Sequence, residues 1–223
     1  MARRRASIGM APLVASVGAV DDIDALTQRA LNAGAELLAR FGLRRWSMDD
    51  VADLAGISRT SLYRKFAGRD ELVYAVLARE VRTVFAAVTR AAASFDQLQD
   101  KVVEGALVAL EAVDGSLVSH LIASDPGTFL PFLTTEAGPL LALARELLVS
   151  QAMALGAVVS REEAAEWAEL AARLGVSFIL TRDTVFPSED PAAARRTLHR
   201  VLGPILAPLA APTGRTSQMT LNS

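Results

Sequence analysis

The stretch that decides the fold is SMDDVADLAGISRTSLYRKF, residues 47–66. Ser47 is placed to cap a first short helix, with Asp50 as an acidic partner three residues on. Two short helices that cross steeply need a small side chain at the crossing and a tight turn, and Ala52 and Gly56 meet these two needs. The stretch therefore predicts a helix-turn-helix.

The second helix of this pair begins after Ser58, and its outward face carries hydrogen-bond donors and cations. From Leu54 to Arg69 there are four cations and no acidic residue, although the whole chain has a net charge of -2. Such side chains suit phosphates and base edges, so the pattern predicts a local DNA-binding surface. A basic amphipathic helix also occurs on ordinary protein surfaces, and the spacing and the two caps favour the DNA-binding interpretation.

The rest of the chain indicates an all-α protein, because its 52% apolar residues are mainly Ala, Leu and Val and follow helical spacing. Gly42 ends a first helix at 24–41, and a long helix at 69–93 follows the helix-turn-helix. Further helices are predicted at 95–113, 116–124, 137–155, 161–181 and 191–209. The expected units are a disordered arm at 1–21, a three-helix DNA-binding head at 22–68, a helical ligand-binding and dimerisation body at 69–211, and a disordered tail at 212–223.

Several classes of function are disfavoured. The chain has no Cys, and its two histidines, His120 and His199, lack metal-ligand spacing. With no Gly-rich phosphate loop or nucleophile motif either, we expect no enzyme, no metal and no cofactor. The longest stretch without charge, Ala6 to Val20, has 15 residues where a membrane-spanning helix needs about 20. We therefore expect a cytoplasmic protein that does not bind membranes.

Residues 25–77 resemble the TetR family of bacterial transcriptional regulators. The likeness is strongest in DVADLAGIS from Asp50, in SLYRKF from Ser61, and in RDEL from Arg69. It implies a homodimer in which Tyr63 and Lys65 contact phosphates, Arg59, Thr60 and Ser61 face bases, and Trp46, Ser47 and Arg69 flank the DNA backbone. With the outward face of the second helix, the full predicted DNA-binding set is Trp46, Ser47, Ser58, Arg59, Thr60, Ser61, Tyr63, Arg64, Lys65 and Arg69.

The body contains a helix at 137–155 that is apolar nearly all round, which requires burial on most sides. One interpretation is central core packing. The other is an apolar cavity, closed by Phe129 and Phe132 in a Pro/Gly-broken connector that acts as a mobile lid. The predicted ligand-binding residues are Leu107, Leu110, His120, Leu121, Phe129, Phe132, Leu143, Leu147 and Trp167. Few polar groups accompany them, so we expect a small hydrophobic effector such as a lipid or acyl chain.

The last two long helices predict the dimer face. One has a stripe of small residues, and the other a broad apolar face. The two sets are Ala164, Ala168, Ala171, Ala172 and Gly175, and Leu198, Val201, Leu202, Ile205, Leu206 and Leu209. The predicted function is a ligand-responsive regulator, a repressor, that binds a palindromic double-stranded operator as a homodimer. The alternative is a TetR-like DNA-binding protein without a small-molecule ligand, controlled by a protein partner or constitutive.

Overall fold

The computed structural model describes residues 12, 15–17, 24–43, 45–113, 116–154, 156–181, 185–187 and 189–210. These residues form helices and no strand, which confirms the prediction of an all-α protein. The helices are α2 (Ala25–Phe41), α3 (Met48–Ala55), α4 (Arg59–Lys65), α5 (Arg69–Ala92), α6 (Leu98–Val113), α7 (Leu117–Ser124), α8 (Pro126–Leu133), α9 (Gly138–Ala154), α10 (Arg161–Leu180) and α11 (Pro191–Ala210).

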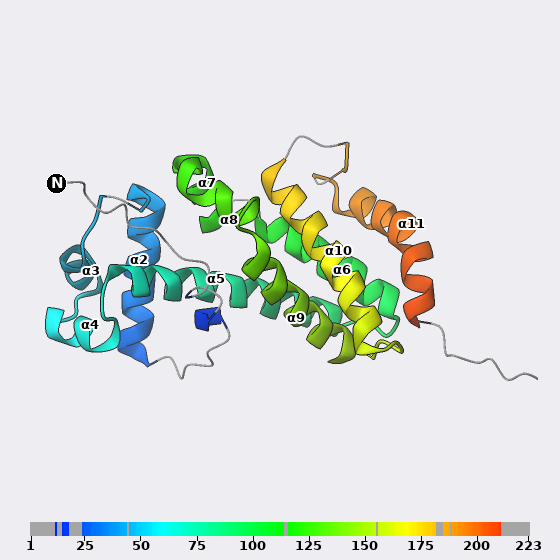
Figure 1. The fold of residues 1–223 in the computed structure, drawn as a ribbon, viewed down its shortest axis with the longest axis horizontal. Helices are drawn as coiled ribbons and strands as arrows, with labels where there is room; N and C mark the ends of the chain where they lie inside the picture. The colour runs from blue at the N-terminus through cyan, green and yellow to red at the C-terminus, as the bar shows by residue number, and fades with distance from the viewer. Residues whose placement is uncertain are drawn as a thin grey trace, which may run out of the picture.

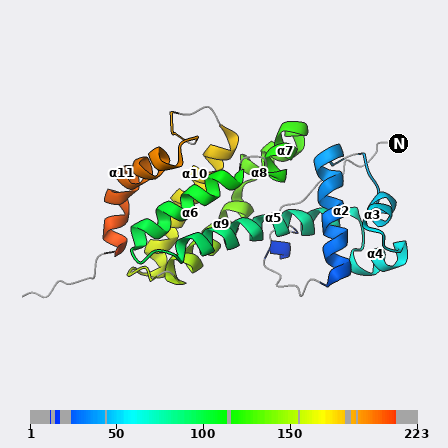
Figure 2. The ribbon, with the colours of Figure 1, turned by 180° about the vertical axis from the view of Figure 1, so that it is seen from behind.

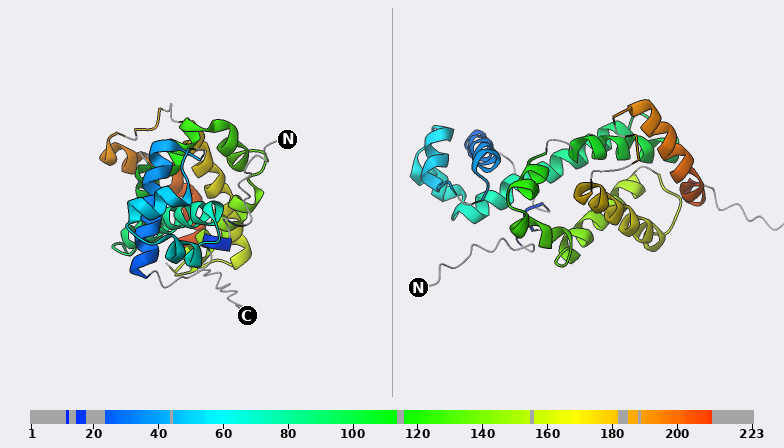
Figure 3. Two further views of the ribbon diagram at one scale, coloured as in Figure 1. Left: turned by 90° about the vertical axis from the view of Figure 1, so that its left-hand side faces the viewer. Right: turned by 90° about the horizontal axis from the view of Figure 1, so that it is seen from above.

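The molecule is elongated, with a small head at one end and a larger body at the other (Figures 1 and 2). Helices α2, α3 and α4 form the head, and α5 runs out of it along the body. Helices α6, α9, α10 and α11 lie at the far end, while α7 and α8 lie between the two parts. Seen from above, α5 and α6 form one side of the body, and α9 and α10 the other (Figure 3).

Caps and turns fix the lengths of the head helices. The Asp24 carboxylate accepts a hydrogen bond from the Thr27 backbone at 2.8 Å and begins α2. Gly56 ends α3 with φ of 61° and ψ of 40°, a left-handed conformation that costs glycine little. Leu38, Val51 and Leu62 are inaccessible to solvent at the centre of the head, so the predicted helix-turn-helix is confirmed. Leu54, in contrast, is 46% exposed and contributes little to that core.

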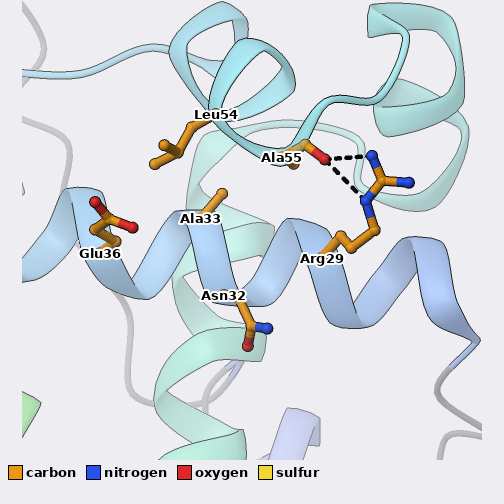
Figure 4. A pocket seen from close by; sticks show the side chains of 6 residues that line it. All are labelled: Arg29, Asn32, Ala33, Glu36, Leu54 and Ala55. Atoms are coloured by element: carbon orange, nitrogen blue, oxygen red, sulfur yellow. Dashed lines mark hydrogen bonds between the residues drawn. The ribbon is translucent and has the colours of Figure 1, made fainter.

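Arg29 on α2 holds the turn between α3 and α4 in place (Figure 4). Its Nε and Nη2 donate to the Ala55 carbonyl at 2.9 and 2.6 Å, and its Nη2 also donates to the Gly56 carbonyl. These carbonyls lie at the C-terminal end of α3, where backbone acceptors have no partner within the helix. The same end of a helix attracts positive charge. Arg29 therefore stabilises the tight turn as well as α3.

The connector predicted as a mobile lid is the helix α8 and packs against the head. Pro126 stands at its first position, where proline's missing N–H costs nothing, so the Pro-Gly pair begins a helix rather than interrupting one. Phe129 is buried in the same apolar cluster as Leu38 and Leu62, together with Leu121 of α7, and Phe132 packs against that cluster. One continuous core therefore joins the head to the first part of the body.

The small-residue stripe of α10 is divided between two environments. Ala164, Ala168 and Ala172 are buried in clusters with residues of α9, so they permit close packing inside one chain rather than between two chains. Ala171 and Gly175 are exposed. On α11, Leu206 is buried and Leu198 and Leu202 pack inward, while Val201 and Ile205 are exposed. The side chain of Leu209 lies outside the described residues.

Part of the predicted disordered arm is helical and docked. Val17 is only 6% exposed, and Arg82 on α5 donates a hydrogen bond of 2.6 Å to the Ser16 carbonyl. The carbonyls of Ser16 and Val17 thus find a donor on the body, which the polar composition of the arm's first residues did not indicate. The other residues of the arm and the tail at 212–223 lie outside the described residues.

No single described helix is long and apolar enough to cross a membrane. One bent pair, α6 with α7, reaches the required length and composition only when its two helices are taken together.

Replacing Arg29 by Ala is expected to lower the free energy of unfolding by about 2 kcal/mol, because it leaves the Ala55 and Gly56 carbonyls without their charged donor. Thermal or urea unfolding followed by circular dichroism measures the change. The control is Arg40→Ala on the same helix, which removes only the exposed pair with Glu36 and is expected to cost about 0.5 kcal/mol or less. Equal losses for the two variants would contradict the role assigned to Arg29.

Candidate nucleic-acid interface

Helix α4 turns one face into the head and presents the other to solvent. Leu62 is fully buried, and Phe66, which ends the helix, is 6% exposed. With these two side chains turned inward, the polar side chains must lie outside, and Tyr63 is 51% exposed. The exposed set on and beside α4 comprises Ser58, Arg59, Thr60, Tyr63, Arg64 and Lys65, whereas Ser61 is half-buried. The structure thus brings most of the predicted DNA-binding residues to one surface.

Three predicted DNA-binding serines have local roles in the caps. The Ser58 hydroxyl accepts from the Ser61 backbone N–H at 3.1 Å and donates to the Ser61 hydroxyl at 2.9 Å. Ser47 and Asp50 form a capping box in which the carboxylate accepts from the Ser47 backbone N–H at 2.7 Å and from its hydroxyl at 2.8 Å. These bonds to the charged form lower the pKa of Asp50. Ser47 itself is exposed at the start of α3.

Trp46, which was predicted to lie beside the DNA backbone, is buried inside the head. It is 6% exposed, and its indole N–H donates to the Gly42 carbonyl at 2.7 Å, so the ring has no donor left for a phosphate. The Arg69 guanidinium lies 4.5 Å from the centre of the Trp46 ring, a cation–π contact. The sequence showed an amphipathic aromatic residue near the caps but not the loop that folds it inward.

Arg69 begins α5 and is only half-buried. The buried Trp46 ring contacts its guanidinium and holds it at the surface of the head. Burial lowers the pKa of its guanidinium, which nevertheless stays charged at neutral pH. The Nε–H of Arg69 is buried and donates no hydrogen bond; among the described residues, no other buried side-chain nitrogen or oxygen lacks a partner. A buried donor without a partner is costly, so the position of this guanidinium is not explained by its hydrogen bonds within the head.

Two cations of α4 are held by carboxylates from other parts of the head. Arg59 Nη1 lies 3.0 Å from Asp49 Oδ2 of α3, and Lys65 Nζ lies 2.7 Å from Asp24 Oδ2 at the start of α2. The Lys65 ammonium, followed by the Thr27 bonds, holds the pKa of Asp24 well below its usual range. The charge pattern of residues 54–69 did not reveal these pairs, because both acids come from outside that stretch.

The predicted ligand-binding residues are spread over several parts of the body. Leu121, Phe129 and Phe132 belong to the core shared with the head, Leu107 packs in a cluster with α11, and Trp167 packs beside Leu98 and Leu206. Leu110, Leu143 and Leu147 are half-buried and His120 is exposed. The structure therefore does not gather these nine side chains around one cavity.

Two open pockets stand out among the described residues, and both involve the head. One of about 190 Å³ lies between α2 and α3 and is lined by Arg29, Asn32, Ala33, Glu36, Leu54 and Ala55 (Figure 4). The other, of about 300 Å³, lies where the end of α2 meets α7. His120 lines the second pocket together with Arg40, Phe41, Gly42, Leu43, Arg45, Ser124 and Asp125.

Two family models match the chain. The model described as "Bacterial regulatory proteins, tetR family" matches residues 30–76, and the model described as "Bacterial Tetracyclin repressor, C-terminal domain" matches residues 97–204. The first covers the head and the start of α5, and the second covers most of the body. The chain belongs to the TetR family.

Two relatives place this TetR-family chain among regulators. It is 33% identical over 117 residues to the "HTH-type transcriptional repressor KstR2" of Rhodococcus jostii (strain RHA1), an alignment that covers 48% of this chain and 56% of that protein. The chain thus spans about half the length of that curated relative. The crystal structure of the TetR family repressor AlkX from Dietzia sp. strain DQ12-45-1b is 25% identical, with a TM-score of 0.64, over 82% of this chain and 98% of that one.

The relatives that these comparisons found are transcriptional regulators rather than enzymes. In the described part of the chain, no group of three or more His, Cys, Asp or Glu side chains is arranged to hold a metal ion. Sequence reasoning missed Arg29, Asp24 and Asp49 as residues that shape the head. The acid that precedes α2 was visible as a cap signal, but its pairing with Lys65 required the fold.

Replacing Asp50 by Asn is expected to reduce the acid sensitivity of the head. The folded-state pKa of Asp50 is lowered, so its stabilising effect is present above its unfolded pKa near 4 and is lost as the pH falls through the lower folded pKa. Melting temperatures measured from about pH 6 down to pH 2 should therefore fall less in Asp50→Asn than in the wild type. A parallel fall in both proteins would contradict this contribution.

Proposed function

We propose that this chain is a homodimeric cytoplasmic repressor that binds a palindromic operator through α4 and releases it when a hydrophobic effector of the lipid or acyl-chain kind occupies the body. The observation that carries the proposal is the outward face of α4, where exposed cations and hydroxyls stand over a buried Leu62. This arrangement suits a helix that enters the major groove.

The start of α5 supports contact with the DNA backbone. Arg69 lies beside the end of α4 in the chain, is stacked on Trp46, and has a buried Nε without a partner among the described residues. A phosphate at this place would interact favourably with the charge of the guanidinium and with the positive end of a 24-residue helix. Together, α4 and Arg69 would divide the work between base edges and phosphates.

Exposed apolar side chains on α10 and α11 support the homodimer. Leu170 and Leu174 lie one turn apart on α10 and are 56% and 57% exposed, and Val201 and Ile205 have the same spacing on α11, at 53% and 38%. Apolar stripes on two long helices are typical of a four-helix interface between two copies. A two-fold axis through that interface would place the two heads on half-sites about 34–36 Å apart.

The proposed effector is hydrophobic because the body offers mainly apolar side chains. Leu140, Leu143 and Leu147 of α9 are only half-buried, so they have surface left to cover. The similar repressor AlkX is implicated in biodegradation of n-alkanes, which are apolar molecules, and this link to apolar compounds supports an apolar effector for this chain. The alternative, control by a protein partner or no control, is favoured by the spread of the nine predicted ligand-binding side chains over separate clusters of the body.

The proposed switch acts through the shared core. Leu121 and Phe129 pack with the buried residues of α2, and Arg79 of α5 donates to the Asn32 side chain at 2.8 Å and to the Leu31 carbonyl at 3.2 Å. A ligand that shifts α7, α8 or α5 would therefore rotate the head. Its effect is limited to its difference in affinity between the two arrangements.

Replacing Lys65 by Ala is expected to weaken binding to the operator and to reduce the slope of log K against log salt by about 0.9, because one phosphate contact is lost. Fluorescence anisotropy with a duplex selected by the wild-type chain from a random pool measures both quantities. The matched control is Arg90→Ala, an exposed cation at the far end of α5, which should change neither. An unchanged slope in Lys65→Ala would contradict the assignment of α4.

Replacing Leu174 by Glu is expected to convert the dimer to a monomer, because the charge would be buried in an apolar interface. Size-exclusion chromatography with light scattering measures the mass. Leu130→Glu on α8, where the leucine is 37% exposed, is the control and should leave the dimer intact. A wild-type chain that is monomeric at tens of micromolar would rule the proposed interface out.

Binding of an apolar effector is expected to raise the melting temperature and to lower the affinity for the selected duplex. Both measurements use a panel of fatty acids, alkanes and sterols, and native mass spectrometry after mild extraction searches for a bound molecule. If no member of the panel shifts either quantity and no bound species is found, the alternative without a small-molecule ligand is the better account.

A further inference from the structure

The two ends of α4 carry cations that are already paired in the DNA-free chain. Arg59, the first residue of the helix, contacts Asp49 of α3 at 3.0 Å, and Lys65, the last residue, contacts Asp24 at 2.7 Å. Arg64 lies between these two cations in the sequence, and it forms no ion pair with any residue in the described part of the chain. Two carboxylates of the head thus partly neutralise the positive charge of the surface that would meet DNA.

Folding stability does not account for these pairs. The side chains of Arg59 and Asp49 are 63% and 45% exposed, and those of Lys65 and Asp24 are 37% and 50% exposed. Pairs this open to water add little to stability, because solvent screens them and the long side chains lose freedom. Their position is the informative feature, since both carboxylates lie beside the cations that would reach DNA.

A phosphate that approaches either cation must displace the carboxylate or lie close to it, and both cost free energy. Loose binding to unrelated DNA depends almost wholly on exchange of counterions for cations, so it loses most when cations are already paired. A fitted operator offers base-edge bonds at the same time. The Asp49 pair uses Nη1 of a guanidinium that has five N–H donors, so Arg59 keeps donors for a guanine edge.

We propose that Asp49 and Asp24 are specificity-determining residues of the head: they hold Arg59 and Lys65 in internal ion pairs that a fitted operator takes over and unrelated DNA does not. This inference rests on the proposed function of α4 as the helix that reads the operator. It assigns to two acidic residues outside α4 the suppression of non-specific binding.

The test compares three single substitutions of equal charge change. Asp49→Asn frees Arg59, and Asp24→Asn frees Lys65 while the amide still caps α2. The matched control is Asp53→Asn, because Asp53 is an exposed acid on the same helix as Asp49 and forms no ion pair within the described residues. Circular dichroism melts establish that all three variants fold as the wild type does.

Anisotropy titrations use the duplex selected by the wild type and a scrambled duplex of the same length and composition. For the scrambled duplex, each freed cation is expected to steepen the slope of log K against log salt by up to about 0.9. The affinity that is gained when salt is lowered from 1 M to 0.1 M should therefore be up to about eightfold greater in the variant than in the wild type. The selected duplex should gain less, so the ratio of the two affinities falls in Asp49→Asn and Asp24→Asn and stays near the wild-type ratio in Asp53→Asn.

Two results would overturn the inference alone: both variants behaving like Asp53→Asn, or both gaining equally on the two duplexes while the wild type still selects an operator. If the wild-type chain selects no duplex from the random pool, the proposed function is wrong and the inference falls with it. The selection step therefore separates the two failures.

Discussion

Burial of Leu62 and Phe66 in the core of the head is the constraint on which the DNA-binding surface depends. A helix of seven residues makes two turns, so fixing two inward side chains fixes the direction of all the others. Arg59, Tyr63, Arg64 and Lys65 face outward for that reason. The same burial requires α3 to end abruptly, and the left-handed Gly56 with the Arg29 hydrogen bonds satisfies that requirement.

The head is tied to the body by packing rather than by α5 alone. Leu121 and Phe129 belong to the same buried cluster as Leu38, and the hydrogen bonds from Arg79 join α5 to α2. Densely packed protein interiors transmit displacement. In the proposed switch, a shift of α7 or α8 would therefore reach the head through this shared cluster.

The head carries cations that would attract DNA and carboxylates that partly neutralise them. The chain as a whole has a net charge of -2, but the stretch from Leu54 to Arg69, which contains α4 and the start of α5, has four cations and no acidic residue. Asp24 and Asp49 bring two opposite charges into the same region from other helices. Trp46, meanwhile, supports Arg69 from inside the fold. The resulting surface is less basic than the stretch from residue 54 to 69 suggests when it is considered alone.

The sequence by itself determined the local features of this protein. Helical periodicity, the caps at Ser47 and Ser58, and the Ala52–Gly56 spacing predicted the all-α fold and the helix-turn-helix, because caps and turns depend on residues three or four positions apart. The resemblance of residues 25–77 to the TetR family also rests on short stretches of neighbouring residues. The outward face of α4 followed from these features, since its inward side chains are apolar.

Only the tertiary structure decided which distant residues meet. Trp46 is amphipathic and reads equally well as surface or core, and the loop at Gly42 turned it inward. The alanines of α10 fit either a partner chain or α9, and packing within the chain claimed three of them. Phe129 fits a cavity wall or a core, and the head supplied the core. In each case the apolar character of the side chain shows that it favours burial. Only the arrangement of the helices determines which other residues it packs against.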